Sequence, residues 1–524
     1  MDKLLTPQDI KQILDDRIKG YDYKLLKEIP SPDLFKDMEL ATNRIVEAIN
    51  SGETINLVGD YDVDGVISTA IMIEFFNFLN ININHIIPNR FDHGYGLSPK
   101  ILDHINDGLI ITVDNGISAY EAADICKKRG LDLIITDHHT VGDKLPEAYA
   151  IVNPKQSDCN YPFEEICGAQ VAWYLCASIK NKLKLNYNLM ELFDLLSLAI
   201  VADIMPMVSL NQTIVKHGLN ALSRSNRVSI KAIKERFYIQ NFNEEDIGFK
   251  LAPLINCAGR MSDASIALEF LLSRSQFEAN ENLEYLIELN ETRKQDQLNI
   301  FNEAKLQVNE DDKVIVVASE NWNEGIIGIV ASKLCEKYKK PAFVFTIKDD
   351  IAKASSRSTS DVHLYELIDS CKDLVLGFGG HKQAAGLSCE TSKLKLFKEA
   401  LNKNIKTQES KEPTLDPSVL GQISLCDVDS DIYNLIESYR PFGQDNRYPV
   451  FLFKNIDVIN VNKIGKNKEY MKLMVSNGKS CKDMLVFNDI DQIYPNTKIN
   501  FIATISKNEF RGEVNYNLLL KEIL

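Results

Sequence analysis

Three aspartates at alternating positions, Asp60, Asp62 and Asp64, directly follow the apolar run 55–59. If the chain stays extended there, alternate side chains project to the same side. Carboxylates at such close quarters repel one another unless a cation neutralises them, and oxygen ligands suit Mg²⁺ or Mn²⁺. The spacing therefore indicates a divalent-metal site, with a solvated acidic turn as the alternative.

Further candidate ligands stand downstream. Asp114 and Asp137 each directly follow a short β-branched run, and His138 comes next to Asp137. Asp203 lies in an otherwise apolar stretch, where an acid must be paired or bound to a cation. We interpret the recurrence as a two-metal site.

A particular scaffold is needed to bring these segments together. Helix-like stretches at 66–79 and 118–129 separate the three β-branched runs, which is typical of a parallel, doubly wound α/β sheet. In such sheets ligands bind beyond the carboxyl ends of the strands. The acidic segments fall at those ends, so the sequence predicts a site along one edge of the sheet.

The order and spacing of these motifs resemble the DHH phosphoesterase superfamily. The rest of the chain is similar to one branch of it, the RecJ-type single-stranded-DNA exonucleases. The segments that carry the resemblance are Asp60-Tyr-Asp62-Val-Asp64-Gly65, Asp114-Asn-Gly116, Asp137-His138-His139, Val201-Ala-Asp203, Pro88-Asn-Arg90, Gly94-Tyr-Gly96, Ile255-Asn-Cys-Ala-Gly-Arg260, Gly325-Ile-Ile-Gly328-Ile-Val-Ala331, Ser355-Ser-Arg357, Gly379-Gly380-His381 and Arg440-Pro-Phe-Gly443.

The expected organisation is two α/β lobes joined by a long helix, followed by a C-terminal barrel of the oligonucleotide-binding (OB) type. The lobes are a parallel-sheet DHH lobe and a smaller DHHA1-like lobe. The predicted parts are an N-terminal helical segment (1–45), the DHH lobe with the metal site (46–225), a helical connector (226–310), the DHHA1-like lobe (311–407), a polar linker (408–417) and the barrel (418–524).

Local patterns predict several elements of the later parts. An amphipathic pattern over 264–308 indicates a long helix. The barrel is expected from closely spaced short strands, at 449–455, 457–464, 469–476, 498–506 and 514–521.

Two divalent ions can bridge a scissile phosphate and activate water for hydrolysis. Carboxylates suit Mn²⁺ or Mg²⁺, and an added imidazole favours Mn²⁺. A supporting role explains Asp60 equally well, and a buried core histidine is the alternative for His138. The expected metal ligands are Asp60, Asp62, Asp64, Asp114, His138 and Asp203.

Asp137 and His139 are the expected catalytic residues. Neighbours at a strand end alternate in direction, so both should point away from His138. Asp137 is assigned to orienting an imidazole. The resemblance implies that His139 faces the phosphate, where it stabilises charge or protonates the leaving group.

The resemblance also implies residues that hold the terminal phosphate across a cleft. A serine hydroxyl and a guanidinium fork suit phosphate, and glycines let the backbone approach a ligand closely. Taken alone, these residues fit a solvated loop, a tight turn or ordinary salt bridges. The expected phosphate- or nucleic-acid-binding set is Arg90, Arg260, Ser355, Arg357, Gly379, Gly380 and His381.

The chain departs from the family at one position. Where relatives usually have Trp-His, this sequence has Trp322-Asn323. Asparagine can form hydrogen bonds but cannot carry a proton, so we assign Asn323 no acid–base role.

The net charge of −15 conflicts with binding to a polyanion, so we expect arginines concentrated locally along a groove. Ten cysteines without a Cys-x-x-Cys pair indicate reduced thiols and a cytoplasmic protein. No apolar run is long enough for a membrane span.

The sequence and the resemblance together predict a metal-dependent exonuclease. It would degrade single-stranded DNA from the 5′ end to mononucleotides, in DNA repair and recombination. The family implies single-strand-binding protein and a helicase as partners, and we expect a monomer. The alternatives are a phosphodiesterase acting on short oligonucleotides or cyclic dinucleotides, and a non-catalytic scaffold for nucleic acid.

Overall fold

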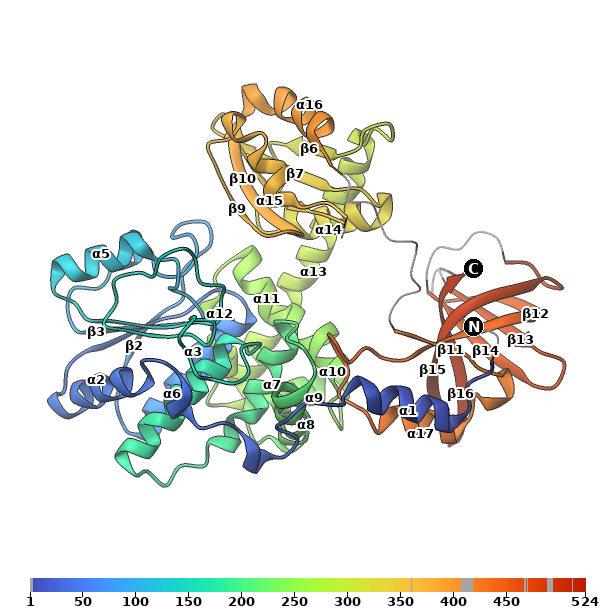
Figure 1. Cartoon of the computed structure of the whole chain (residues 1–524), viewed down its shortest axis with the longest axis horizontal. Helices are drawn as coiled ribbons and strands as arrows, with labels where there is room; N and C mark the ends of the chain where they lie inside the picture. Colours follow the sequence, from blue (N-terminus) through green and yellow to red (C-terminus); the bar gives the residue numbers. More distant parts are fainter. Residues whose placement is uncertain are drawn as a thin grey trace.

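The computed structural model describes residues 3–359, 361–406, 418–465, 468, 470–487, 493–510 and 512–524. Figure 1 shows a large α/β lobe with attached helices, a second α/β lobe carried on the long helix α13 (Gln276–Gln307), and a C-terminal barrel. The expected fold class, α/β with a terminal barrel, is therefore confirmed. The predicted linker 408–417 lies outside the described residues.

A five-stranded parallel sheet forms the first lobe, in the order β2-β1-β3-β4-β5. All residues of the three central strands are buried, which explains their continuous apolar sequences. Alternate residues enter two different cores, one on each face of the sheet. The strands are β1 (Ile55–Val58), β2 (Asn84–Ile86), β3 (Leu109–Val113), β4 (Leu133–Thr136) and β5 (Ala150–Val152).

Helices cover both faces of this sheet. Three helices pack in the core on one face, and two shorter ones pack on the other. The predicted helices at 66–79 and 118–129 are present with slightly different ends. The first group is α2 (Met38–Ser51), α3 (Val63–Phe78) and α6 (Gly168–Leu183), and the second is α4 (Pro99–Leu102) and α5 (Tyr120–Arg129).

A group of helices connects the two lobes. The pattern predicted as one helix over 264–308 divides into α12 and α13, and α13 contacts α9 and α11 as well as α14 of the second lobe. Among the described residues no helix is long and apolar enough to cross a membrane. The helices are α7 (Phe193–Ala202), α8 (Ser209–Arg224), α9 (Val228–Phe237), α10 (Glu244–Asp246), a π-helical turn (Ile247–Leu251), α11 (Ala252–Met261) and α12 (Ser265–Leu271).

The second lobe contains a mixed sheet in the order β6-β7-β8-β10-β9. Only β6 and β7 run parallel, and the other neighbours are antiparallel among the strands described. The elements are β6 (Ile315–Ser319), α14 (Ile327–Tyr338), β7 (Ala342–Lys348), β8 (Ile351–Arg357), α15 (Leu364–Asp369), β9 (Gly377–Gly380), β10 (Ala384–Glu390) and α16 (Leu394–Asn404).

The C-terminal sheet closes into a barrel because β12 pairs with both β13 and β15. Two predicted strands, 449–455 and 457–464, are one strand, which bends where its pairing with β15 shifts register and Asn455 adopts a positive φ. The prediction missed β14, since Lys482 and Asp483 interrupt its apolar alternation. The strands are β11 (Val419–Gln422), β12 (Val450–Ile464), β13 (Tyr470–Ser476), β14 (Cys481–Val486), β15 (Lys498–Phe510) and β16 (Glu513–Ile523).

The N-terminal segment 1–45, expected as one helical part, divides between two bodies. Helix α1 (Pro7–Arg17) places Ile10 and Leu14 in the core of the barrel and contacts α17 (Ser430–Glu437). Helix α2 packs in the first lobe instead. The chain thus begins on the barrel (Figure 1), a long-range contact that local sequence patterns cannot reveal.

Candidate active site

Three aspartates mark the carboxyl edge of the parallel sheet. Asp60 follows β1, Asp114 follows β3 and Asp137 follows β4, and these strands are immediate neighbours in the sheet. Asp114 has a φ of 63°, so the chain turns sharply as it leaves β3. Sequence and structure therefore agree on the position of the site.

Asp62 and Asp64 enter the site from the start of a helix, not from an extended segment as expected. The chain does not stay extended, because Asp62 is the N-cap of α3 and Asp64 lies in the first turn of that helix. The Asp64 carboxylate accepts the backbone N–H groups of Gly168 (2.5 Å) and Ala169 (2.8 Å) at the start of α6. The start of α6 therefore holds the Asp64 carboxylate in position by two backbone hydrogen bonds.

Gly168 is a site residue that sequence reasoning missed. A Cβ atom at this position would lie 2.4 Å from Oδ1 of Asp114, closer than real Cβ contacts allow. Only glycine therefore lets the start of α6 approach both Asp64 and Asp114. No local signal marks it, since 104 residues separate it from Asp64.

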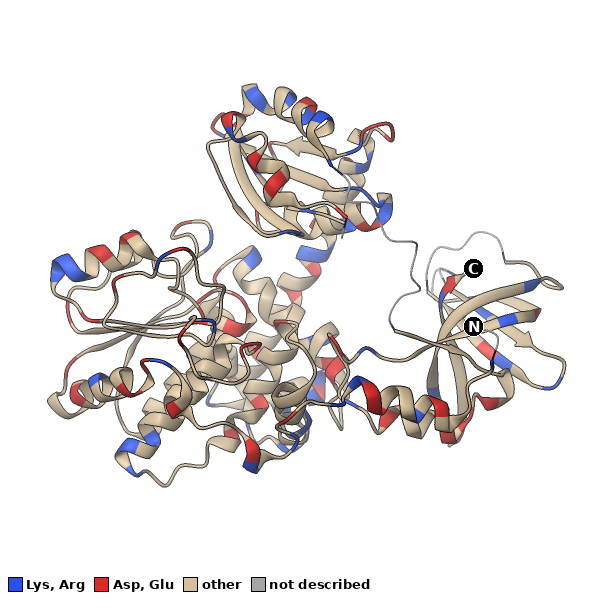
Figure 2. Cartoon of the chain, in the orientation of Figure 1, with Lys and Arg blue, Asp and Glu red and all other residues tan. Residues whose placement is uncertain are grey.

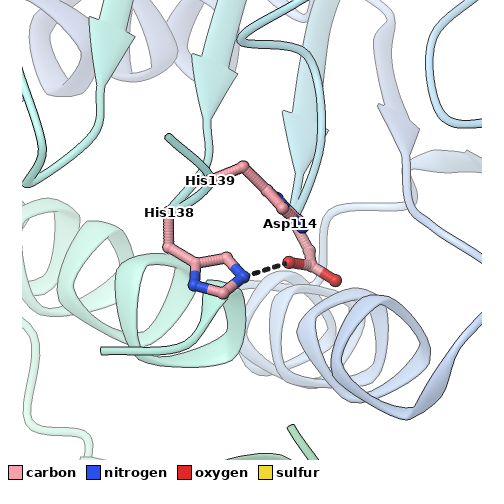
Figure 3. A group of neighbouring side chains, drawn as sticks. All are labelled: Asp114, His138 and His139. Carbon is pink, nitrogen blue, oxygen red and sulfur yellow. Dashed lines mark ion pairs between the residues drawn. The ribbon is translucent and has the colours of Figure 1, made fainter. Parts of the chain in front are cut away.

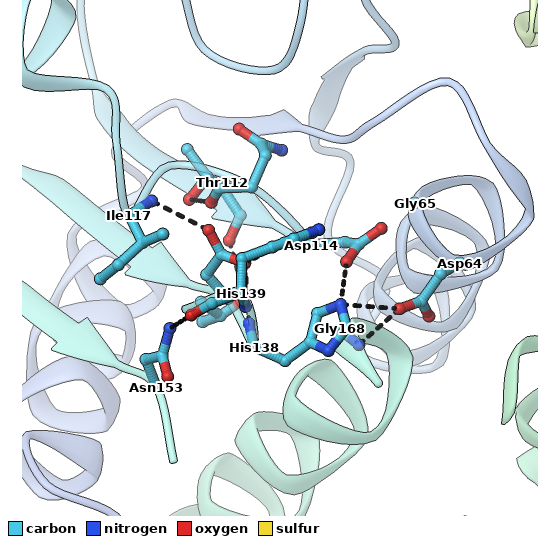
Figure 4. A network of polar contacts seen from close by, with 12 residues as sticks. Asp64, Gly65, Thr112, Asp114, Ile117, His138, His139, Asn153 and Gly168 are labelled. Atoms are coloured by element: carbon cyan, nitrogen blue, oxygen red, sulfur yellow. Dashed lines mark hydrogen bonds and ion pairs between the residues drawn. The ribbon is translucent and has the colours of Figure 1, made fainter. Parts of the chain in front are cut away.

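His138 is surrounded by carboxylates (Figures 3 and 4). Its Nε2 atom lies 3.2 Å from Asp114 Oδ1, and 3.7 Å from both Asp64 Oδ2 and Asp203 Oδ2. Burial lowers the pKa of His138, so the neutral ring presents a lone pair. Within the described structure Asp114 Oδ1 and Asp203 Oδ2, which lie near His138 Nε2, are buried and form no hydrogen bond. Unsatisfied carboxylate oxygens that converge on an imidazole in this way fit a metal centre.

The acidic residues cannot all remain ionised without a cation. Burial and the neighbouring carboxylates raise the pKa values of Asp60, Asp62 and Asp114, and raise that of Asp203 to about 8. Among the described residues their atoms form three groups, each compact enough to hold one ion, which overlap at Asp114 and His138. The groups are Asp60, Asp62 and Asp114; Asp64, His138 and Asp203; and Asp114, His138 and His139.

Asp137 and His139 form a separate pair beside the acidic cluster (Figure 4). Asp137 Oδ1 accepts from the backbone N–H groups of His138 and His139 and lies 2.7 Å from Nδ1 of His139, while Oδ2 accepts from the Ile117 N–H. Burial alone would raise the pKa of Asp137, but the hydrogen bonds to His139 and these N–H groups hold it below its usual value. Asp137 therefore orients the His139 ring. Contrary to expectation, that ring stays close to His138, with centroids 4.4 Å apart.

Tyr95 adds an aromatic residue to this corner of the site. Its hydroxyl donates to the backbone carbonyl of Asp114 (3.3 Å) and lies 3.5 Å from Nε2 of His139. Tyr61 lies edge-on to Tyr95 and carries the guanidinium of Arg90 4.3 Å above its ring. The tyrosines were not predicted as site residues, although Tyr95 lies within the motif 94–96.

A cavity of about 530 Å³ opens between the two lobes beside these residues. Arg90 and Tyr95 line it from the first lobe, and Ser355 and Gly379 from the second. Arg260 lines a second cavity, of about 390 Å³, next to Ile204. The structure thus brings part of the predicted phosphate-binding set to one cleft.

The other members of that set lie apart. Among the residues described, Arg357, Gly380 and His381 are absent from the walls of both cavities. Arg357 is close to Gly328 and Ser355, whereas His381 is exposed at the β9–β10 turn.

Three half-buried arginines near the junction of the lobes supply local positive charge despite the negative net charge. Lys and Arg are scattered among Asp and Glu over the whole chain (Figure 2). Within the described residues Arg90, Arg260 and Arg357 form no salt bridge, unlike Arg44 and Arg227. Burial, together with the nearby Arg90, lowers the pKa of Arg260 to about 10. Half-buried cations that form no salt bridge with a described residue favour binding of an anion.

Three family models match consecutive stretches of the chain. The DHH family N-terminal domain matches residues 54–200, the DHHA1 domain 311–407 and the RecJ OB domain 421–522. These stretches coincide with the parallel-sheet lobe, the mixed-sheet lobe and the barrel. Fold and site thus define a DHH protein with a DHHA1 lobe and an OB barrel.

Similarity to curated relatives extends over nearly the whole chain. A protein named single-stranded-DNA-specific exonuclease RecJ from Bacillus subtilis is 36% identical over 507 residues, which cover 94% of this chain but only 64% of the relative. The protein of that name from Escherichia coli is 32% identical over 528 residues, which cover 93% of this chain and 90% of the relative. The chain belongs to the RecJ family.

Solved structures show the same architecture. RecJ from Thermus thermophilus in complex with Mn²⁺ superposes with a TM-score of 0.81 at 24% identity, covering 97% of this chain and 73% of that one. An exonuclease RecJ bound to manganese gives a TM-score of 0.63 at 30% identity, covering 70% of this chain and 94% of that one. Both of these proteins were solved with manganese bound.

Proposed function

We propose that this protein is a metal-dependent exonuclease that degrades single-stranded DNA to mononucleotides. One observation carries the proposal: buried carboxylates with unsatisfied oxygens converge on the His138 imidazole, next to a cleft lined by Arg90, which forms no salt bridge among the described residues. A metal cluster beside an anion-binding cleft is suited to hydrolysing phosphodiesters. The relatives named single-stranded-DNA-specific exonuclease and the match to an OB domain support the choice of substrate.

Each group of residues has a distinct role in this reaction. Asp64, His138 and Asp203 would hold one divalent ion, and Asp60, Asp62 and Asp114 the other, as Mn²⁺ or Mg²⁺. Such ions, when bound, stabilise charge on phosphoryl oxygens and activate water.

The remaining polar residues act on the phosphate and the leaving group. Asp137 holds the His139 ring by its Nδ1 atom, which leaves Nε2 free to donate a proton to the leaving oxygen or to stabilise its charge. Arg90 and Ser355, on opposite walls of the cleft, bind the phosphate and set its position relative to the acidic cluster.

We further propose that digestion starts at the 5′ end. A 5′-phosphate anchored at Ser355, Arg357 and the 379–381 turn would place the adjacent phosphodiester over the acidic cluster. The burial of Arg357 and its position next to Ser355 support this anchor. Arg357→Ala should slow digestion of 5′-phosphorylated strands far more than that of 5′-hydroxyl strands. Equal slowing of the two substrates would place the anchor elsewhere.

A length series tests the proposed substrate. Initial rates on single strands from two to about fifty nucleotides, with Mn²⁺ and with a chelator, should show metal-dependent cleavage that is most efficient on long strands, because the barrel adds a stacking platform. Cleavage confined to dinucleotides would favour the short-oligonucleotide phosphodiesterase. Absence of cleavage at every length would leave a non-catalytic scaffold.

The wider setting is proposed on the same basis. The matches at 54–200, 311–407 and 421–522 support a division into catalytic lobe, phosphate-binding lobe and strand-binding barrel. We place the protein in the cytoplasm, where its ten free cysteines stay reduced, as a monomer in DNA repair and recombination. Single-strand-binding protein and a helicase are its proposed partners.

A further inference from the structure

An ion pair stands between two cavities at the junction of the lobes. Lys353 Nζ lies 3.3 Å from Glu324 Oε2, and both residues line the 530 Å³ cavity that contains Arg90 and Ser355. Both also line a neighbouring cavity of about 760 Å³, whose wall includes Trp322. The pair therefore divides the phosphate-binding cleft from the space beyond it.

The β8 strand places Lys353 in line with the proposed phosphate ligands. Alternate residues of a strand share a face, and Lys353, Ser355 and Arg357 are the more exposed set, while Ala352, Ala354 and Ser356 are buried. The three side chains thus form one row on β8, of which Lys353 and Ser355 line the cleft. Among the residues described, Glu324 is the one carboxylate in the wall of this cavity.

Tight backbone packing fixes Glu324 at this position. The side chain of Asn323 accepts the Gly325 N–H (2.8 Å), and Arg260 donates to the Gly325 carbonyl (3.3 Å). A Cβ atom on residue 325 would lie 2.1 Å from the Arg260 carbonyl oxygen, so this loop lies directly against α11. Asn323, which replaces the histidine of relatives, acts here as a loop support.

The ion pair between Glu324 and Lys353 contributes little to the stability of the fold. The side chains are 56% and 38% exposed, and ion pairs with that much solvent contact contribute little to folding free energy. A carboxylate in a cleft lined by cations instead weakens the binding of any phosphate that comes next to it. Because Glu324 lines both cavities, the effect is selective for strands that continue from one cavity into the other.

We propose that Glu324 and Lys353 close the cleft and restrict the enzyme to strand ends. A terminal phosphate stops at Ser355 and Arg357, within reach of Lys353. An internal segment would have to continue past the pair and bring a second phosphate against the Glu324 carboxylate. The inference rests on the proposed nuclease function, because it explains why that activity would begin only at an end.

The proposal is tested by comparing circular and linear single strands of equal length and composition. With Mn²⁺, the wild-type protein should digest the linear strand and leave the circle intact, whereas Glu324→Ala should also cut the circle. In chelator, the ratio of circle affinity to linear affinity, measured by fluorescence anisotropy, should rise on the order of tenfold in the variant. Glu324→Gln, which keeps the side-chain shape, provides the same comparison if the alanine variant does not fold.

Two further variants distinguish the loss of the Glu324 charge from other effects of a substitution in this region. Glu320 is an exposed carboxylate in the same loop, and it lines the 760 Å³ cavity but not the 530 Å³ cavity. Glu320→Ala should therefore behave as wild type. Lys353→Ala keeps Glu324, so it should raise KM for 5′-phosphorylated linear strands and leave circles uncut.

The outcomes are distinguishable from failure of the proposed function. Intact circles and an unchanged affinity ratio in a Glu324 variant that digests linear DNA would overturn the inference, and so would cutting of circles by Lys353→Ala. A wild-type protein that fails to digest linear DNA would instead refute the proposed exonuclease.

Discussion

Asp114 shows how the site depends on a cation. Its carboxylate is 1% exposed, Oδ1 has no hydrogen-bond partner within the described chain, and burial and its acidic neighbours raise its pKa well above the usual value. A carboxyl group whose pKa is raised by folding destabilises the folded state at neutral pH, where the unfolded chain ionises it freely. The residue therefore costs stability in the metal-free protein, and binding of a cation offsets that cost.

Asp114→Asn should separate stability from function. Hydrolysis should fall by at least about a thousandfold, because loss of a shared ligand raises the barrier by several kcal/mol. In chelator at neutral pH, the free energy of unfolding of the variant should exceed that of the wild type by about 1 kcal/mol, because the substitution removes a buried charge that its neighbours repel. Urea denaturation and nuclease assays measure both quantities. Near-wild-type turnover would remove Asp114 from the site, and Asp124→Asn on the exposed face of α5 is the control.

Asp137→Asn tests whether Asp137 acts through His139. The amide cannot accept the His139 Nδ1 hydrogen bond with the strength of a carboxylate, so kcat should fall about 10- to 100-fold with little change in KM. Steady-state kinetics on a single-stranded oligomer measure this split. A raised KM with unchanged kcat would instead show that Asp137 serves substrate binding.

The sequence predicted the chemistry at this scale better than the geometry. Asp60, Asp114 and His138 were recognisable because acids that follow β-branched runs must meet at one sheet edge. Gly168 was not recognisable, since its importance arises only where α6 meets Asp114 in three dimensions. His139 was expected to point away from His138, but its bond to Asp137 turns the ring back toward the cluster.

At the scale of elements, the start of α6 acts as part of the metal centre. Its first two N–H groups bind Asp64, and its missing Cβ at Gly168 leaves room for Asp114. The helix thus fixes two ligands that come from different segments. Any side chain at its first residue must push one of them out of place.

Gly168→Ala should weaken metal binding while the fold persists. The added Cβ would meet Asp114 Oδ1 at 2.4 Å, so the Mn²⁺ concentration needed for half-maximal thermal stabilisation should rise on the order of tenfold. Gly248→Ala is a matched control, because a Cβ there meets nothing within 4 Å. Equal Mn²⁺ dependence in the two variants would contradict the role assigned to α6.

Elements were predicted well where the alternation is regular and poorly where packing decides. The runs that became β1, β3 and β4 were identified because they are buried on both faces. In the barrel, β12 was divided in two because a strand that bends and changes partners has no simple period. Strand β14 was missed because Lys482 and Asp483 interrupt its apolar alternation.

Across the whole molecule, the N-terminal segment links the barrel to the catalytic lobe. Ile10 and Leu14 of α1 lie in the barrel core, and the segment that follows bonds to α8 through the carbonyls of Asp22 and Tyr23. A second link between the barrel and the helices of the first lobe is the ion pair between Arg440 and Glu244 of α10. The position of the barrel therefore depends on contacts from both the N-terminal segment and the segment around Arg440.

Leu14→Ala should destabilise the barrel by about 2–4 kcal/mol, because it leaves a cavity in that core. We expect earlier urea unfolding of the barrel and weaker digestion of long strands, with cleavage of the shortest oligomers retained. Leu4→Ala, at a leucine that is 47% exposed, is the matched control. Unchanged unfolding would show that α1 is not part of the barrel core.

We propose that the metal cluster and the second lobe together remove nucleotides from the 5′ end of a single strand. The most direct test of this proposal follows one 5′-phosphorylated oligomer, labelled in separate reactions at either end, during digestion with Mn²⁺. The 5′ label should appear at once in mononucleotides, while the 3′ label should remain on progressively shorter fragments. Early release of the 3′ label as mononucleotide, or labels that both remain on large internal fragments, would contradict the account.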